Sequence, residues 1–191
     1  VFLYNLIRSL YDEIRFRLYH GPVFHRFLNR KFAYYRNLTW PAKMRFLHLV
    51  RDHYEYFTFS GREMNVTRGM KVIVSAAASQ LVFNLPEESL TYFERIIIYP
   101  DYYNSRITHK VHKGEVNPGF KVIVFSWRGV EEGLPVGSDG INLLLHEFAH
   151  ALWLEHKLVG HTYRVLDRNE IEDFELLADT EMDALHRDEA H

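Results

Sequence analysis

The chain has 191 residues, no cysteine and a formal net charge of −2 at pH 7. The absence of cysteine excludes disulfides, thiolate metal ligands and thiol catalysis, and it fits a reducing, cytoplasmic location. The near-neutral charge argues against direct nucleic-acid binding. With 47% hydrophobic and 15% aromatic residues, the composition is that of a packed globular protein.

The sequence was searched for membrane spans, targeting segments and domain boundaries, and it shows few such features. No apolar run reaches the roughly 18 residues that indicate a membrane span. The apolar start is soon broken by Arg8 and Asp12 and lacks an initiator Met, so we expect a trimmed N-terminus, and an upstream signal or anchor stays open. There is no repeat, low-complexity tract or linker, which predicts one domain over residues 1–191.

The first 60 residues are predicted to be helical. Basic and aromatic residues alternate over residues 26–36, which favours an amphipathic helix with a solvated basic face over a site for nucleic acid or an acidic partner. Thr39 and Pro41 predict the start of a helix that ends near Phe57. Thr67 is the predicted cap of a further helix that runs to Leu81.

Strand signals follow in the second half of the chain. Residues 95–99 read as a buried strand, residues 109–113 as a weaker one, and residues 121–127 as the best strand in the sequence, entered through a turn at residues 117–119. A helix over residues 140–156 and an acidic helix over residues 171–185 are predicted to follow. We interpret this order as an α+β domain, with a helical N-terminal portion over residues 1–60 and a catalytic portion over residues 61–191.

The stretch that specifies chemistry is His146-Glu147-Phe148-Ala149-His150. Two histidines four residues apart lie on one side of a helix, so both imidazoles can reach one metal ion. His146 and His150 are therefore the predicted ligands of Zn²⁺, and Glu147 is the predicted general base. The competing interpretation is a pair of hydrogen-bonded core histidines with a surface glutamate.

The flanks of this motif favour the metal site. Ser138 or Asp139 can cap the helix, and apolar residues precede and follow the motif, which predicts a largely buried helix. Buried His and Glu side chains are tolerated when they bind a metal or pair with each other. In zinc peptidases a strand at the sheet edge commonly holds an extended substrate; residues 121–126 are the candidate, and an interior strand is equally compatible with their sequence.

A catalytic zinc takes three protein ligands, and the third is not evident. His156 follows His150 by six residues, but Trp153 stands where metzincin-type sites have Gly, so the helix need not break and His156 is expected on the opposite side. Further candidates lie in an acidic stretch that also fits a solvated helix face: Glu170, Glu172 and Glu175. His109 and His112 would point to opposite faces of a strand. His161 and Tyr163 could reach the cleft but also fit a surface loop.

Several segments, above all HEFAH and the preceding Ser126-Trp127-x-Gly129, together resemble the Mlc titration factor A family of glucose-regulated zinc metallopeptidases. The resemblance covers roughly residues 40–185 and rests on residues 97–100, 122–129, 140–142 and 146–152. It implies a zincin fold of the gluzincin-like type, related to that of anthrax lethal factor, with zinc as cofactor and aminopeptidase-like activity on peptide or protein substrates. In the best-known branch it also implies a cytoplasmic partner, the transcriptional repressor Mlc, which is sequestered by binding.

Two departures from the family pattern stand out. Trp153 occupies the place of an Asp that follows the motif in other members. The family's third ligand is a Glu in a Glu-Phe-Phe-Ala-like segment well downstream, and no such segment occurs before His191. We therefore expect the catalytic portion to be incomplete at its C-terminal end, with the third ligand beyond His191, or with Glu170 or Glu175 in that role within the chain.

These observations rank three functions. The first is a zinc metallopeptidase. The second is a protein-binding regulator that sequesters a transcriptional repressor, with peptidase chemistry secondary or lost. A purely structural zinc site ranks last, because such sites use four protein ligands, usually with thiolates, and this chain has no cysteine.

Overall fold

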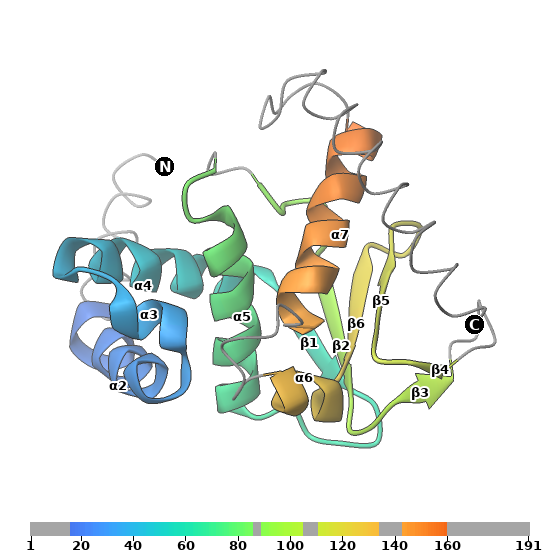
Figure 1. The fold of residues 1–191 in the computed structure, drawn as a ribbon, viewed down its shortest axis with the longest axis horizontal. Helices are drawn as coiled ribbons and strands as arrows, with labels where there is room; N and C mark the ends of the chain where they lie inside the picture. The colour runs from blue at the N-terminus through green and yellow to red at the C-terminus, as the bar shows by residue number, and fades with distance from the viewer. Residues whose placement is uncertain (1–15, 86–88, 105–110, 134–142, 160–191) are drawn as a thin grey trace, which may run out of the picture.

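The computed structural model describes residues 16–85, 89–104, 111–133 and 143–159 (Figure 1). Within these ranges the helical elements are a π-helical turn η1 (Phe16–His20), α2 (Gly21–Lys31), α3 (Ala33–Asn37), α4 (Trp40–Tyr56), α5 (Arg68–Val82), α6 (Trp127–Gly133) and α7 (Leu143–Val159). The strands are β1 (Thr58–Gly61), β2 (Arg95–Tyr99), β3 (Tyr103–Asn104), β4 (Val111–His112), β5 (Gly114–Asn117) and β6 (Val122–Ser126). This mixture of helices and a small sheet confirms the predicted α+β class.

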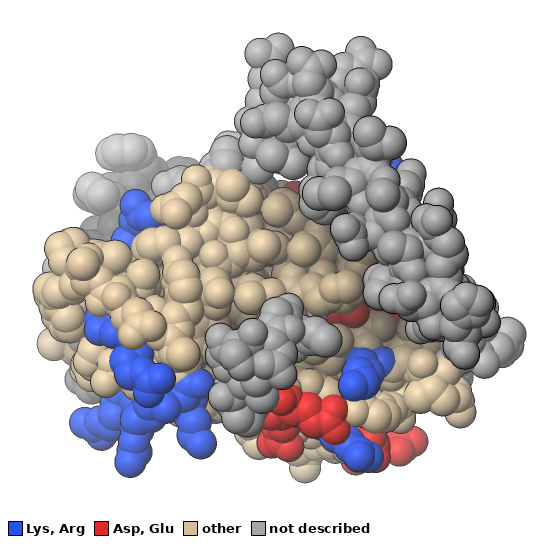
Figure 2. All heavy atoms as spheres, in the orientation of Figure 1, with Lys and Arg blue, Asp and Glu red and all other residues tan. Residues whose placement is uncertain are grey.

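The N-terminal helices are amphipathic, as predicted. On α2 the apolar side chains of Phe24 and Leu28 are buried, whereas Arg26 and Arg30 are exposed. The helix ends before Phe32, whose extended backbone separates α2 from α3. Figure 2 shows Lys and Arg side chains gathered at the end of the molecule where α2 and α3 lie. The basic face is therefore solvated, and the aromatic residues of this region pack toward the core.

The two long helices that follow begin where the sequence predicts. α4 starts directly after Thr39, although the Thr39 side chain makes no capping hydrogen bond. α5 starts after Thr67, whose Oγ1 accepts a hydrogen bond from the backbone N–H of Met70 at 3.2 Å. That bond satisfies one of the N–H groups that a helix start leaves unpaired. α4 and α5 pack against each other, and α5 in turn packs against α7.

The main sheet has four strands in the order β1-β2-β6-β5. β1, β2 and β6 run parallel to one another, and β5 runs antiparallel to β6. The two faces differ in what covers them. One face belongs to the hydrophobic core that includes α5 and α7, and it contributes the side chains of Ile96, Ile98, Ile123 and Phe125. The alternate side chains form a smaller cluster with Tyr103 on the opposite face, as strand periodicity requires.

Four elements were not predicted, among them the two-residue strand β3. The short strand β1 follows α4 and pairs with β2, although the first 60 residues were expected to be helical throughout. β5 lies next to the predicted turn at residues 117–119, where Lys121 N donates to Pro118 O at 3.1 Å. α6 begins at Trp127, directly after β6. The predicted strand at 109–113 is found in part as β4, and its first residues lie outside the described ranges.

Of the two interpretations left open for residues 121–126, the structure supports the interior strand and contradicts the sheet-edge strand. β6 pairs with β2 on one side and with β5 on the other, so its backbone groups are used within the sheet. All five side chains of β6 are buried, which explains its strong apolar signal. The edge nearest α7 is instead β5. In the part of the chain that the structure describes, no helix is long and apolar enough to cross a membrane.

Candidate active site

The HExxH residues lie on α7, which packs across the sheet beside β5 and β6 (Figure 1). The helix runs unbroken from Leu143 to Val159, three residues further than predicted. Its predicted caps, Ser138 and Asp139, lie outside the described residues. Phe148 anchors the helix, because its ring is fully buried and lies 5.6 Å from the ring of Phe125 on β6. The motif is thus carried by a rigid element.

The helix is less buried than the sequence suggested. Leu144, Glu147 and Phe148 face the core, whereas His146 and His150 are exposed. We predicted that the helix is apolar and buried around most of its circumference, and this prediction is wrong. The histidines face outward, and the glutamate faces inward. Only one side of the helix lies on the sheet, and apolar content alone did not tell which side is covered.

The two histidines converge on one point. His146 Nε2 and His150 Nε2 lie 3.0 Å apart, and their rings are nearly perpendicular at 86°. At this distance one neutral imidazole donates its N–H to the bare nitrogen of the other. Partial desolvation, and then the neighbouring His146, lower the pKa of His150 and favour its neutral form. Neutral imidazole nitrogens are the form in which histidine binds metals.

This geometry fits a zinc ion. A tetrahedral zinc with Zn–N distances of about 2.0–2.1 Å holds two nitrogens about 3.3 Å apart. The observed separation of 3.0 Å between the two Nε2 atoms requires only a small outward movement of one ring. Their outward exposure also leaves a path by which a metal and a substrate could reach them. Among the described residues, however, no group of three His, Cys, Asp or Glu side chains could hold a metal.

Glu147 lies beneath the edge strand β5. The residue is 7% exposed, and burial together with the nearby Glu115 carboxylate raises the pKa of Glu147 to about 7. A Cβ atom at Gly114 would lie 2.5 Å from Glu147 Oε1 and 2.6 Å from Cγ. Only glycine lets the strand pass this close to the carboxylate. A carboxylate with a pKa near neutrality suits a group that both takes up and releases a proton.

Ser126, Trp127 and Gly129 position the start of α7. Ser126 Oγ is buried and accepts a hydrogen bond from Gly129 N at 3.0 Å, which fixes the turn from β6 into α6. A Cβ atom at Gly129 would lie 2.9 Å from Cδ2 of Leu143, the first residue of α7. The Trp127 Nε1–H donates to Glu131 Oε1 at 2.8 Å, and the partly buried Trp127 side chain packs against the hydrophobic core. These residues therefore bring α6 against the helix that carries the motif.

A second carboxylate, Glu155, ties α7 to the segment before β2. Glu155 is 2% exposed, and its Oε1 accepts hydrogen bonds from Thr91 N at 2.9 Å and Thr91 Oγ1 at 3.1 Å. Its Oε2 is buried without a hydrogen-bond partner among the described residues. Burial raises the pKa of this carboxyl, and the bonds from Thr91 oppose the shift. Nothing in the sequence distinguished Glu155 from a solvated helix residue.

The other predicted site residues are not brought to the pair of histidines. His156 lies on the same unbroken helix, as expected from the absence of Gly at position 153. His112 lies on β4 opposite Tyr103. The remaining predicted residues lie outside the described ranges: His109, His161, Tyr163, Glu170, Glu172 and Glu175. The third ligand therefore stays a prediction.

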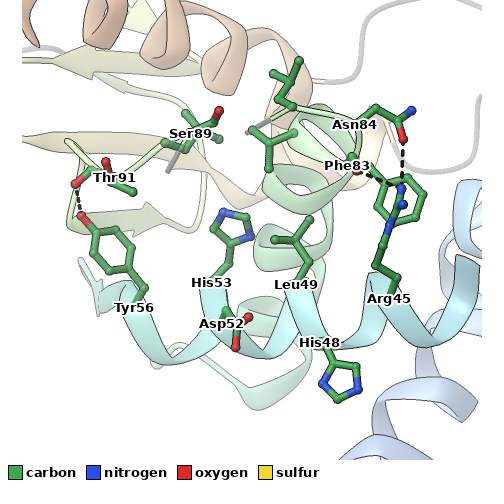
Figure 3. A pocket seen from close by; sticks show the side chains of 13 residues that line it. Arg45, His48, Leu49, Asp52, His53, Tyr56, Phe83, Asn84, Ser89 and Thr91 are labelled. Carbon is green, nitrogen blue, oxygen red and sulfur yellow. Dashed lines mark hydrogen bonds between the residues drawn. The ribbon is translucent and has the colours of Figure 1, made fainter. Parts of the chain in front are cut away.

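A cavity of about 670 Å³ lies between α4 and the segment that follows α5 (Figure 3). At one end Arg45 donates to the carbonyl oxygen of Phe83 at 3.2 Å and to Asn84 Oδ1 at 3.0 Å. His53 and Ser89 line the middle of the cavity. None of the HExxH side chains lines it, so it is separate from the candidate site.

The sequence alone did not reveal that Gly114 lies against Glu147. A signal did exist, because a glycine inside a short strand often marks the close approach of another group.

The chain was compared with known proteins. A family model described as glucose-regulated metallo-peptidase M90 matches residues 17–191. The search of curated proteins gave no match.

Proposed function

Because the chain belongs to the glucose-regulated metallo-peptidase M90 family, we propose that it hydrolyses peptide bonds at a zinc ion held by His146 and His150. The observation that carries the proposal is the convergence of the two Nε2 atoms at 3.0 Å on the exposed side of α7. The fold would be a zincin-like one, with α7 as the metal helix. The third ligand would be a glutamate, with Glu170 and Glu175 as the candidates within the chain.

Each residue of the site has a distinct role in this proposal. A bound zinc ion would polarise the scissile carbonyl and acidify the attacking water. The Glu147 carboxylate would accept a proton from that water and then release it to the departing amine nitrogen. Its pKa of about 7 suits both transfers near neutral pH. The two histidines must be neutral, and the lowered pKa of His150 supports that state.

The edge strand β5 would bind the substrate. Among the described strands, β5 pairs only with β6, so its outer backbone groups face away from the sheet beside Glu147. An extended peptide can add to such an edge through backbone hydrogen bonds. Gly114 would then set the depth at which the peptide lies above the carboxylate. The substrate class is thus an extended peptide or an unfolded segment of a protein.

The proposal also covers the extent of the domain, the type of peptidase activity and the location in the cell. We propose one zincin-like domain over residues 1–191, which is supported by the hydrophobic core that joins Phe16 in η1 to Ala151 in α7. Aminopeptidase-like activity and a cytoplasmic location remain part of the proposal. The described residues offer no support for a transcriptional repressor as partner, and none is proposed.

The proposal is tested by two substitutions in the motif. Glu147→Gln should abolish peptide hydrolysis while zinc stays bound, because the amide cannot accept the proton but leaves both imidazoles in place. His146→Ala should lose both zinc and hydrolysis. Glu55→Gln, an exposed carboxylate on α4, is the matched control and should leave both unchanged. Unchanged turnover in Glu147→Gln would reject the mechanism.

A further inference from the structure

The helices α2, α3 and α4 carry a strong excess of positive charge. Every Asp and Glu of the sequence lies outside residues 21–51, a stretch that contains Arg26, Arg30, Lys31, Arg36, Lys43, Arg45 and Arg51. The chain as a whole has a net charge of −2, so its other residues carry a clear negative excess. Figure 2 shows Lys and Arg side chains together over α2 and α3, with no Asp or Glu among them on this face. A charge separation of this kind orients a protein toward an anionic surface.

Four of these cations are exposed and have no carboxylate partner among the described residues. Arg26 and Arg30 lie one turn apart on α2, and Lys31 and Arg36 lie near the ends of α2 and α3. None of them takes part in the ion pairs found within the described ranges. Their mutual repulsion is therefore relieved from outside the described structure, by salt or by an anionic partner. These four residues and Lys43 on α4 form the basic face.

An exposed tryptophan lies at the edge of the basic face. Trp40 is the first residue of α4 and is 63% exposed. Its ring lies 5.7 Å from that of His25 on α2 and is nearly perpendicular to it, at 79°. His25 Nδ1 is 2.7 Å from the hydroxyl oxygen of the buried Tyr35, and Lys43 Nζ lies 5.6 Å from the centre of the Tyr35 ring. Lys43 also donates to the carbonyl oxygen of Arg36 at 2.9 Å. One cluster thus holds the indole at the surface beside two cations of the basic face.

The exposed side of α2 has the same mixed character. Val23, Arg26 and Arg30 are spaced by three and four residues, so they lie on one side of the helix. Val23 is 48% exposed, and both arginines are exposed as well. This part of the molecule therefore presents apolar side chains and unpaired positive charge to the same surroundings.

We propose that the basic face docks on an anionic lipid membrane, with Trp40 at the level of the lipid headgroups. A membrane offers negative phosphates to the cations and an apolar layer beneath them to Trp40 and Val23. Tryptophan is enriched at this depth because its ring is apolar and its N–H is polar. A nucleic-acid duplex would satisfy the cations through its phosphates but offers little apolar surface to Val23. The inference goes beyond the proposed peptidase function and does not depend on it.

Docking by the basic face need not cover the candidate active site. In Figure 1, α5 lies between the helices of the basic face and α7, which carries His146 and His150. α4 packs on α5, and α5 packs on α7. The two histidines and the basic face therefore belong to different parts of the molecule.

The first test measures binding of the whole chain to vesicles by co-sedimentation. Vesicles of phosphatidylcholine with about one third phosphatidylglycerol should bind at least about 10-fold more tightly than vesicles of phosphatidylcholine alone. Arg26→Gln and Arg30→Gln should each weaken that binding by up to about 5-fold, and together by more. Lys121→Gln is the matched control, because it removes the same charge from the turn before β6 and should leave binding unchanged.

Tryptophan fluorescence tests the position of the indole. The other two tryptophans, Trp127 and Trp153, lie on α6 and α7. Vesicles with phosphatidylglycerol should shift the emission of the wild-type chain to shorter wavelength, because the indole of Trp40 leaves water. Trp40→Phe should lose this shift. A shift of equal size in Trp40→Phe would contradict the placement of Trp40 at the headgroups.

Three results would overturn the inference. The first is equal binding to the two kinds of vesicle, or binding to neither. The second is an equal loss in Arg26→Gln and Lys121→Gln, because total charge and not the basic face would then govern binding. The third is binding of a short DNA duplex or single strand, followed by fluorescence anisotropy, without binding of vesicles, which would assign the face to nucleic acid. Circular dichroism checks that each variant keeps its fold, and no step requires peptide hydrolysis.

Discussion

Gly114 lies directly over Glu147, so closely that a Cβ atom at position 114 would be 2.5 Å from Glu147 Oε1. The contact joins the edge of the sheet to the proposed general base. It fixes where the carboxylate can lie and how near an added peptide strand could come to it. The sheet edge and the HExxH helix therefore form one structural unit.

Gly114→Ala should reduce peptide hydrolysis with little loss of stability. The added methyl group has to displace the Glu147 side chain, and a displacement of about 1 Å can lower catalysis about 100-fold. Steady-state kcat/KM is the measurement. Gly119→Ala is the matched control, since its Cβ would have Asn117 Oδ1 at 3.5 Å as its only close neighbour among the described residues. Equal activity in both variants would show that the position of Glu147 does not matter.

The stability of the protein should fall in mild acid because of His53. Burial lowers the pKa of His53 from 6.5 to about 4, and its Nδ1 lies 2.9 Å from Ser79 Oγ. Below pH 6.5 the unfolded chain takes up a proton that the folded chain does not, so acid favours unfolding. The free energy of unfolding should decrease by up to about 3 kcal/mol between pH 6.5 and 4.

Urea unfolding of wild type and His53→Gln across this pH range checks the prediction. At pH 8 the variant is expected to be less stable than wild type, because the substitution removes the His53–Ser79 hydrogen bond and the packing of the imidazole ring. Its free energy of unfolding should vary less between pH 6.5 and 4. Identical pH dependence in the two proteins would contradict the assignment to His53.

The bonds from Thr91 to Glu155 should stabilise the attachment of α7. Glu155→Ala removes the acceptor of two hydrogen bonds and is expected to lower the free energy of unfolding by about 2–3 kcal/mol. Thr91→Val removes only the Oγ1 bond and should have a smaller effect, about 1 kcal/mol. Thermal unfolding measures both. Glu55→Ala on the exposed side of α4 is the control, within about 0.5 kcal/mol of wild type.

Much of the fold could be predicted because its signals are local. The caps and apolar spacing of α4 and α5 lie within a few residues of one another, and the apolar runs of β2 and β6 are long and bounded by turns. The family was also predicted correctly, because HEFAH and the Ser-Trp segment together are far more specific than HExxH alone.

The errors arose where the answer depends on distant residues. The sequence of β6 fitted an edge strand and an interior strand equally well, because whether a strand is interior is decided by β2 and β5, which pair with it. β5 has only one apolar residue, Val116, so it carries no strand pattern. In the same way, which side of α7 is covered is decided by β5 and β6 and not by the helix itself. The role of the motif residues themselves remains a proposal.

The measurement that tests the central claim most directly is zinc affinity, determined by competition with a chromophoric chelator. The 191-residue chain should bind one zinc ion, Glu147→Gln should bind it equally well, and His146→Ala and His150→Ala should each bind it at least about 100-fold more weakly, because affinity follows ligand number. Affinity tighter than about micromolar in wild type would place a third ligand within the chain. Unchanged zinc affinity in His146→Ala and His150→Ala would contradict the account.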